Sequence, residues 1–567
     1  MLLKEDASEE KINGRYFTPR AIAEYIVAWI LQTENEIERV LEPSCGDGIF
    51  LECLLSTPIW GQCKIDAIEI EESIACQAAE RINGNSLQHG WRKIRRLDES
   101  CRIIVDDFYN AYRKGLIEER YQAIAGNPPY IRYQYLTGAQ RDEQSEILTD
   151  NGMHSNKMIN AWVSFVVACV NVMDTESRIG LVLPAELLQV KYAEDLRRYL
   201  VNRLQRLTIV TFENLIFDGI EQEVVLLLGE KTPNLEEHRI RIVQYRDAED
   251  MIVRNDLDMY EFYNADLSGN KWTKYFLNHR QNHLIDAIKN DNRFVKFGSI
   301  AKCEVGITTG NNNYFSINRD IVDRYNLEEY CRPLIARSVN IKGIVFTEDD
   351  WMENVTRGAK TYLLDLATVD QENFNDGLKE YIELGENKGE NKGYKCRIRN
   401  EWYKVPSVWS PNAFFLRRNY LYPKFMLNSN DVNAVSTDTM HRVTINDNID
   451  EKLLLLAYYN SVSLAFTEIE GRSYGGGVLE ILPGEVSNIM IPNLHELEGM
   501  GDEEIGELVD MIDRHVRGNT DILGVLDIID RRILVEMLGM NMNDVLEMRD
   551  AWLTLRSRRL YRGGRED

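Results

Sequence analysis

Residues 40–55, VLEPSCGDGIFLECLL, limit the fold of this chain more than any other stretch. Their apolar start predicts the end of a buried strand, Gly46 and Gly48 permit a tight turn with close ligand approach, and the apolar residues that follow begin a helix. A strand, a glycine turn and a helix in this order predict the first unit of a doubly wound α/β sheet, where nucleotides bind at the carboxyl ends of strands. The dinucleotide pattern GxGxxG is not met, because Leu51 stands at its third glycine position.

An acid inside this turn indicates which nucleotide it suits. Glu42 would repel a pyrophosphate, whereas it would attract a ligand with a cationic centre and an amino-acid tail. The turn therefore favours S-adenosylmethionine over NAD. Its acid-Pro-x-Cys-Gly-x-Gly form is also more specific than a glycine turn alone.

Two further predicted strands lead to acids. In KIDAIEIEE, Glu69 lies about 20 residues beyond the glycines, where an acid can accept hydrogen bonds from the two ribose hydroxyls. CRIIVDDFYN brings Asp107 and Phe108 to a strand end, where they suit the amino group and the ring face of adenine. Two alternatives stand beside these roles: Glu69 is one more acid in an acidic chain, and Asp107-Phe108 is a helix cap before a core phenylalanine.

A fourth predicted strand, YQAI, runs into the stretch AGNPPY. Pro128 and Pro129 fix φ twice, remove two backbone donors and hold the preceding residues extended. The resulting ledge suits a flat ring that carries an amine, because the Asn127 side-chain oxygen and the Pro128 carbonyl can accept its two protons while Tyr130 stacks on its face. The alternative is an ordinary Asn-Pro turn in which Tyr130 only packs.

Residues 14–31, GRYFTPRAIAEYIVAWIL, predict an amphipathic helix. Thr18 is the expected N-cap and Pro19 the first helical residue. Isoleucines at every fourth position form the expected apolar stripe.

Together these features resemble the amino-methyltransferases that modify adenine N6 in DNA, in the TaqI-like class of restriction–modification enzymes. The resemblance covers roughly the first 231 residues and rests on Thr18-Pro19, Glu42-Pro43-x-Cys45-Gly46-x-Gly48-x-Phe50, Glu69, Asp107-Phe108 and Asn127-Pro128-Pro129-Tyr130. In that class the cofactor motifs come first and the target-recognition domain comes last.

The resemblance implies a role for each matching residue. The methionine end of S-adenosylmethionine would be bordered by Thr18, Glu42, Pro43, Cys45, Gly46 and Gly48. The ribose would be held by Glu69, and the cofactor's adenine would be surrounded by Ile70, Asp107 and Phe108. The catalytic residues that hold the target base would be Asn127, Pro128, Pro129 and Tyr130.

One departure concerns a second aromatic residue that can contact the extruded base in this family. Near the last predicted strand, EVVLLLG offers only aliphatic side chains. Phe217, a few residues earlier, is the candidate.

Three regions are expected along the chain. Residues 1–245 predict a Rossmann-like, doubly wound α/β catalytic domain, 246–495 a mixed, β-rich DNA target-recognition domain, and 496–567 a small helical region that shows helical periodicity. Residues 232–295 are expected to extend the sheet edge and connect the domains. The recognition domain is identified by the resemblance of residues 295–317, 332–343 and 436–443.

Residues 391–426 concentrate cations and aromatic rings in a chain of net charge −25. Such a segment indicates phosphate contact, and the alternative is a solvated face over core aromatics. The predicted DNA-contact residues in it are Lys395, Arg397, Arg399, Lys404, Arg417 and Arg418. Arg472 and Tyr474 join them from the stretch GRSYGGG, which could equally be a glycine hairpin with a buried tyrosine.

Composition bounds the remaining possibilities. The first 20 residues lack an apolar signal core, no run reaches membrane length, and nine cysteines show no zinc-ligand spacing. We therefore expect a cytoplasmic protein with no metal and no membrane association, either a monomer or a weak dimer.

The expected activity is methyl transfer from S-adenosylmethionine to adenine N6 in a short duplex DNA sequence, with a cognate restriction endonuclease encoded separately as a further partner. Two alternatives stand beside it. One is a protein glutamine N5 methyltransferase, because Asn-Pro-Pro-Tyr also serves an amide nitrogen, although such enzymes are much shorter. The other is a DNA-binding methylation subunit that depends on a partner.

Overall fold

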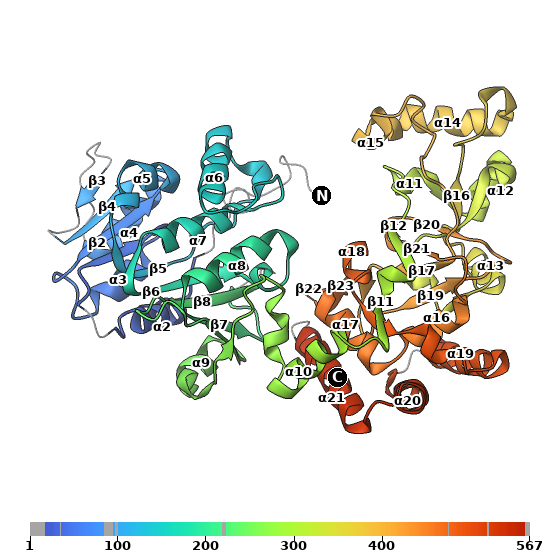
Figure 1. The fold of residues 1–567 in the computed structure, drawn as a ribbon. Helices are drawn as coiled ribbons and strands as arrows, with labels where there is room; N and C mark the ends of the chain where they lie inside the picture. Colours follow the sequence, from blue (N-terminus) through green and yellow to red (C-terminus); the bar gives the residue numbers. More distant parts are fainter. Residues whose placement is uncertain are drawn as a thin grey trace. The chain divides into compact units, whose positions relative to one another are not determined.

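The chain forms two compact units, residues 1–276 and 277–567. A computed structural model describes residues 17–33, 36–83, 94–96, 100–217, 223–474, 476–518 and 521–561. The first unit gathers its strands into one large sheet, and the second has shorter strands in several sheets (Figure 1). In the described ranges, no helix has both the length and the apolar character needed to cross a membrane.

The large sheet has the strand order β10-β9-β7-β8-β6-β5-β1-β2-β4-β3. Its strands are β1 (Arg39–Glu42), β2 (Lys64–Glu69), β3 (Ile94–Arg96), β4 (Cys101–Val105), β5 (Tyr121–Gly126), β6 (Met173–Pro184), β7 (Arg206–Phe212), β8 (Val224–Glu230), β9 (Arg239–Tyr245) and β10 (Tyr263–Asn264). Strands β4, β2, β1, β5 and β6 run parallel, and β8 joins β6 in the antiparallel sense. These pairings confirm the predicted doubly wound α/β fold.

The helices of this unit are α2 (Arg20–Ile30), α3 (Ile49–Leu55), α4 (Glu72–Asn83), α5 (Phe108–Lys114), α6 (Gly138–Asp150), α7 (Ala161–Asn171), α8 (Glu194–Arg203) and α9 (Ala248–Arg254). From β1 the chain proceeds to β2 and β4 on one side, then returns to β5 on the other side of β1. This reversal leaves a crevice at the carboxyl ends of the strands, which is the usual ligand site of such sheets.

Helix α2 confirms the predicted apolar stripe, whereas the predicted cap is wrong. The helix begins at Arg20, Pro19 occupies the N-cap position, and no side chain caps it. Its stripe is buried on β6, where a Cβ at Gly180 would lie 2.6 Å from the Ile26 side chain. Glycine at this position therefore lets the helix lie close on the sheet.

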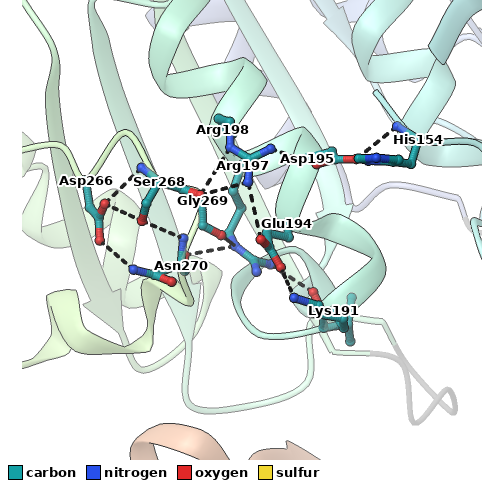
Figure 2. Close-up of polar contacts among 11 residues, drawn as sticks. His154, Lys191, Glu194, Asp195, Arg197, Arg198, Asp266, Ser268, Gly269 and Asn270 are labelled. Carbon is teal, nitrogen blue, oxygen red and sulfur yellow. Dashed lines mark hydrogen bonds and ion pairs between the residues drawn. The ribbon is translucent and has the colours of Figure 1, made fainter. Parts of the chain in front are cut away.

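The first unit extends to residue 276, beyond the boundary expected near 245. Strand β10 pairs with β9 at the sheet edge, which fits the expected edge extension. The segment after β10 then packs on helix α8, as Figure 2 shows. These contacts keep residues 246–276 within the first unit.

Arg197 is the centre of this attachment. Its side chain is buried, and burial lowers its pKa to about 10. It donates to four main-chain carbonyls, those of Leu187, Val190, Gly269 and Asn270, at 2.9–3.1 Å. Arg198 adds donation to the Ser268 carbonyl at 3.2 Å (Figure 2). The segment 268–270 is thus held through its main-chain carbonyls, which do not require particular side chains in this segment.

The described residues of the second unit form four sheets. Their orders are β12-β21-β17-β19-β15, β13-β16-β14-β20, β18-β23-β22 and β11-β24. The strands are β11 (Phe294–Lys296), β12 (Ala301–Val305), β13 (Ser316–Ile317), β14 (Cys331–Ile335), β15 (Val345–Phe346), β16 (Tyr362–Leu364), β17 (Ala413–Leu416), β18 (Arg418–Asn419), β19 (Phe425–Asn428), β20 (Val435–Ser436), β21 (Met440–Ile445), β22 (Arg472–Tyr474), β23 (Val478–Glu480) and β24 (Met490–Pro492). Strands β22 and β23 pair antiparallel, as expected of a glycine hairpin.

Its helices are α10 (His279–Lys289), α11 (Asn312–Phe315), α12 (Arg319–Tyr325), α13 (Glu348–Thr356), α14 (Asp376–Lys388), α15 (Tyr394–Arg397), α16 (Glu451–Tyr458), α17 (Ser461–Glu470), α18 (Pro483–Val486), α19 (Asp502–Arg517), α20 (Leu523–Ile529) and α21 (Met542–Tyr561), with a π-helix at Asp530–Met537. Buried Asp530 accepts from the Ser461 main-chain nitrogen at 2.8 Å and pairs with Arg549 at 2.7 Å. Arg559 of α21 pairs with Glu468 of α17 at 2.8 Å. The C-terminal helices therefore form part of the second unit.

Gly269 gives a test of the attachment between α8 and the segment after β10. Its φ is +82°, and an added Cβ would lie 2.5 Å from the Glu194 carbonyl oxygen. We expect Gly269→Ala to lower the free energy of unfolding of the first unit by about 2–4 kcal/mol, the sum of left-handed strain and overpacking. Urea unfolding of the full chain measures this change.

Gly152 provides the matched control, since its φ is +71° but no atom lies within 4 Å of its added Cβ. Gly152→Ala should cost only the conformational strain, about 1–2 kcal/mol. Equal losses for the two variants would show that the segment on α8 yields to the methyl group, and would contradict the tight attachment.

Candidate functional site

A cavity of about 340 Å³ lies at the carboxyl ends of β1, β2, β4 and β5. The predicted residues that line it are Thr18, Pro43, Cys45, Gly46, Glu69, Ile70, Asp107, Phe108, Asn127 and Pro129. The predicted residues outside its lining are Glu42, Gly48, Pro128 and Tyr130. The fold thus brings the glycine turn, the two later strand ends and the Asn-Pro-Pro ledge to one cavity.

The two glycines of the turn serve different purposes. Both have positive φ, +52° at Gly46 and +83° at Gly48, which favours glycine. The main-chain nitrogen of Gly46 donates to Glu69 at 3.0 Å, so it joins the turn to the end of β2. At Gly48 an added Cβ would lie 2.9 Å from the Ala78 Cβ, so this glycine lets α4 pack against the turn.

Glu69 is held in place by main-chain donors. Its side chain is buried, and its two oxygens accept from the nitrogens of Gly46 and Glu71 at 3.0 Å and 2.9 Å. Each carboxylate oxygen can accept more than one hydrogen bond. The geometry therefore allows Glu69 to accept from a ligand hydroxyl as well.

Glu42 is a buried acid at the end of β1. Its side chain is 1% exposed, and neither carboxylate oxygen has a hydrogen-bond partner within the described part of the chain. Burial raises its pKa well above the usual 4.5, and the nearby acids Asp47 and Glu69 add to the rise. An unpaired buried carboxylate is costly. A cation bound beside this end of the sheet would reduce that cost.

The Asn127 side chain points its donor end toward Thr18. Its Nδ2 donates to the Thr18 hydroxyl oxygen at 3.2 Å, and its main-chain carbonyl accepts from the Ser44 hydroxyl at 3.0 Å. Thr18 therefore orients the ledge rather than capping α2. A Cβ at Gly126 would lie 3.0 Å from the Pro43 ring, so the ledge and the glycine turn are in close contact.

Tyr130 is buried, with 8% of its surface exposed, and its hydroxyl donates to the Val182 carbonyl at 3.1 Å. Phe217 is likewise buried, within the core of the first unit. In this structure, neither aromatic ring belongs to the cavity lining.

Asp107 and Phe108 form the helix cap and the core contact of the alternative interpretation, and both also line the cavity. Asp107 caps α5 by accepting from the Tyr109 nitrogen at 2.9 Å, and its second oxygen accepts from Gln140 Nε2 at 2.7 Å. The Phe108 ring stacks on Phe165 with centroids 4.4 Å apart. Both residues nevertheless face the cavity.

Sequence reasoning did not single out several lining residues. Phe165 lies on α7, Gln140 on α6, and Tyr135 in the segment before α6. The apolar run around Phe165 predicts a buried helix, but nothing in it indicates which side chain meets Phe108. The polar sequence of α6 gives no signal for Gln140 either.

Most predicted DNA-contact residues in the second unit have acidic or carbonyl partners. Three ion pairs of 3.0 Å or less involve them: Lys404–Glu401 at 2.7 Å, Arg417–Glu480 at 3.0 Å and Arg472–Glu485 at 2.7 Å. Arg399 donates to the carbonyls of Thr308 and Trp402, and burial lowers its pKa. These contacts make the side chains less available to phosphate than the sequence predicts.

The remaining cations stay exposed. Lys395 and Arg397 of α15 are exposed, and within the described ranges neither forms an ion pair. Arg418 is also exposed, 3.5 Å from Glu480. The Tyr474 side chain lies outside the described part of the structure.

Two family models match successive parts of this chain. The one described as N-6 DNA Methylase matches residues 1–267, and the one described as Type II methyltransferase M.Eco57I, C-terminal domain, matches residues 269–534. Their junction lies near the division between the two units.

Curated relatives and a solved structure agree with these matches. The chain is 25% identical to Type II methyltransferase M.AccI of Acinetobacter calcoaceticus over 509 residues, 87% of each protein. It is 26% identical to M.HincII of Haemophilus influenzae over 257 residues, 45% of this chain and 43% of the relative. The type IIL restriction–modification enzyme MmeI, solved with DNA, shares the fold with a TM-score of 0.56 and 12% identity, covering 95% of this chain and 75% of that one.

The N-6 DNA methylase match implies S-adenosylmethionine as the cofactor. The cavity fits this ligand, since it offers acids at the ends of β2 and β4 and lies beside the buried carboxyl group of Glu42, which has no hydrogen-bond partner among the described residues. Among the described residues, no group of three or more His, Cys, Asp and Glu side chains could hold a metal ion. Each part of the chain is thus matched to DNA methyltransferases: residues 1–267 to the N-6 DNA methylases and residues 269–534 to the C-terminal domain of type II methyltransferase M.Eco57I, and the chain is similar to a type II methyltransferase along most of its length.

Proposed function

We propose that this protein transfers a methyl group from S-adenosylmethionine to the N6 amino group of adenine in a short duplex DNA sequence. The observation that carries the proposal is that Asn127 lines the same cavity as the acids at the ends of β2 and β4. The family matches and the Asn-Pro-Pro-Tyr stretch support it. We further propose that the methyl mark protects host DNA in the cytoplasm from a separately encoded endonuclease.

Methyl transfer to an amine requires that the protein orient the two reactants and stabilise their charge. The exocyclic amine of adenine is a poor nucleophile, because its lone pair is delocalised into the ring. Asn127 Oδ1 and the Pro128 carbonyl would accept its two protons and favour a more tetrahedral nitrogen. Bound S-adenosylmethionine supplies an electrophilic methyl group on a sulfonium.

The contacts of Asn127 support this role. Because its Nδ2 donates to Thr18, its Oδ1 is the acceptor end of the amide. Two successive prolines and the Ser44 contact keep the ledge extended. The amine would therefore meet acceptors that are already oriented.

The target adenine must leave the base stack to reach the ledge, since Asn127 lines a cavity. Tyr130 would replace the lost stacking. Its hydroxyl bond to Val182 fixes the ring beside the ledge, and stacking requires that one ring face becomes uncovered when DNA binds.

Asn127→Ala tests the catalytic assignment. It removes one proton acceptor from the ledge, so transfer of labelled methyl groups to DNA should fall by at least about 100-fold. Binding of S-adenosylhomocysteine, measured by calorimetry, should change by less than about threefold. Full activity in this variant, or label appearing in protein instead of DNA, would contradict the proposal.

Glu42→Gln tests the role of the buried acid. The pKa of Glu42 is raised in the folded protein. The stability that its protonated carboxyl group contributes is therefore fully present below pH 4.5, and this part of the free energy of unfolding is lost as pH rises through the raised pKa. The ligand-free variant should therefore exceed the wild type in free energy of unfolding at pH 8 by at least about 1 kcal/mol, since one pKa unit corresponds to about 1.4 kcal/mol. The two proteins should converge toward pH 4.5 in thermal unfolding.

The same variant should bind S-adenosylmethionine about tenfold more weakly, a difference of 1.4 kcal/mol, because the attraction to its cationic end is lost. Exposed Glu80 of α4 provides the control, and Glu80→Gln should change neither property. A Glu42→Gln protein with lower stability at pH 8 and unchanged affinity would show that the acid serves the fold and not the cofactor.

For DNA contact we propose the exposed cations of α15 and β18 rather than the whole basic segment. Lys395 and Arg397 lie between Tyr394 and Ile398, which are 67% and 59% exposed. Free cations beside large exposed side chains suit a phosphate backbone and its sugars. The ion-paired arginines Arg417 and Arg472 would instead support the fold of this unit.

The double variant Lys395→Ala/Arg397→Ala tests this surface. If both side chains contact phosphates, the slope of log affinity against log salt should become shallower by about 1.8, as expected for two phosphate contacts. Fluorescence anisotropy with a target duplex measures the slope. Lys289→Ala, at an exposed lysine of α10, is the control and should leave the slope unchanged. An unchanged slope in the double variant would exclude α15 from the DNA contact.

A further inference from the structure

Gln140 connects helix α6 to a strand end of the cofactor cavity. Its Nε2 donates to Asp107 Oδ2 at 2.7 Å, and both side chains line the cavity. The other Asp107 oxygen accepts from the Tyr109 nitrogen at 2.9 Å. The carboxylate that faces the proposed position of the cofactor's adenine is therefore held by one donor from α5 and one from α6.

The orientation of the Gln140 amide is fixed by Thr137. The Thr137 main-chain nitrogen and hydroxyl both donate to Gln140 Oε1, at 3.0 Å and 3.1 Å. The Thr137 hydroxyl oxygen in turn accepts from the main-chain nitrogen of Gln140. This is a capping box at the start of α6. Because Thr137 engages the oxygen, the amide nitrogen faces Asp107.

The segment between the ledge and α6 also depends on this helix. Arg141 donates to the carbonyls of Tyr133 and Gln134 at 3.2 Å and 3.0 Å, and its guanidinium lies 4.9 Å from the Tyr133 ring centroid. In the same segment, Tyr135 and Leu136 line the cavity. One continuous stretch therefore runs from Asn127, along the cavity wall, to the bond with Asp107.

We propose that Gln140 is a positioning residue for cofactor binding. It orients the Asp107 carboxylate to accept a hydrogen bond from the adenine amine, and it keeps the segment after the ledge against the cavity. This rests on the proposed function, in which the cavity binds S-adenosylmethionine. Asp107 can still accept from the amine, because each oxygen has more than one lone pair. Without the Gln140 bond, Tyr109 would hold one oxygen of the carboxylate, and Oδ2 would lose the donor that orients it toward the amine.

A second contact between the same helices provides a matched control. Arg113 of α5 pairs with Glu143 and Glu146 of α6, each at 3.0 Å, and it does not line the cavity. Arg113→Met would thus loosen α6 from α5 without touching Asp107. Gln140→Leu removes the donor to Asp107 with little change in side-chain size.

The test compares two ligands by calorimetry: S-adenosylhomocysteine and the same molecule with hydrogen in place of the adenine 6-amino group. The wild type should prefer the aminated ligand by about tenfold or more, as expected for a hydrogen bond to a charged acceptor. In Gln140→Leu this preference should fall at least threefold, while Arg113→Met should keep it within a factor of two. Both ligands titrate the same folded protein, so the ratio does not depend on the folded fraction.

An unchanged preference in Gln140→Leu would overturn the inference, and so would an equal fall in Arg113→Met, which would indicate general helix packing. A wild type that binds both ligands equally would remove Asp107 as the amine acceptor, and the role of Gln140 with it, while the cofactor site would stand. A wild type that binds neither ligand would overturn the proposed function together with the inference.

Discussion

The parallel pairing of β5 beside β1 is the constraint on which the site depends. Val40 pairs with Ala123 and Leu41 with Ile124, so the two strands end side by side. The glycine turn follows one strand and the Asn-Pro-Pro ledge follows the other, and Gly126 lets them meet at the Pro43 ring. Because the chain reverses direction across the sheet at this point, the crevice forms here and not elsewhere along the strand ends.

Charge is distributed to match two different ligands. The cavity in the first unit is bordered by acids, and one of them, Glu42, is buried with no hydrogen-bond partner among the residues that the structure describes, which suits a cationic cofactor. In the second unit, the arginines that the sequence brings together are largely neutralised by Glu480 and Glu485. Only a few exposed cations are left for a polyanion, which fits local contact by a chain of net charge −25.

The sequence was sufficient to predict the sheet and most of the cavity's strand-end residues, because acids and glycines at strand ends follow one local pattern. Partners distant in sequence could not be predicted. Gln140, on the polar helix α6, donates to Asp107, and Phe165, on the apolar helix α7, stacks on Phe108. Thr18 contacts Asn127 instead of capping α2. None of these pairings has a periodicity that a single sequence could reveal.

The difficulty of predicting partners distant in sequence also explains two larger differences between prediction and structure, the end of the first unit and the pairing of the basic residues. The first unit extends past residue 245 because buried Arg197 holds main-chain carbonyls, whose sequence is not constrained. The basic segment contains one acid, Glu401, and Glu480, the partner of its Arg417, lies outside residues 391–426. Local charge density therefore did not reveal which of these cations have acidic partners.

We propose above all that the protein methylates adenine N6 in DNA at the Asn127 ledge, with sequence specificity. Single-molecule modification sequencing of methylation-free DNA, treated with the protein and S-adenosylmethionine, tests it most directly. The account predicts N6-methyladenine at one short motif. A mark on cytosine, or no mark on DNA from a protein that binds the cofactor, would contradict it.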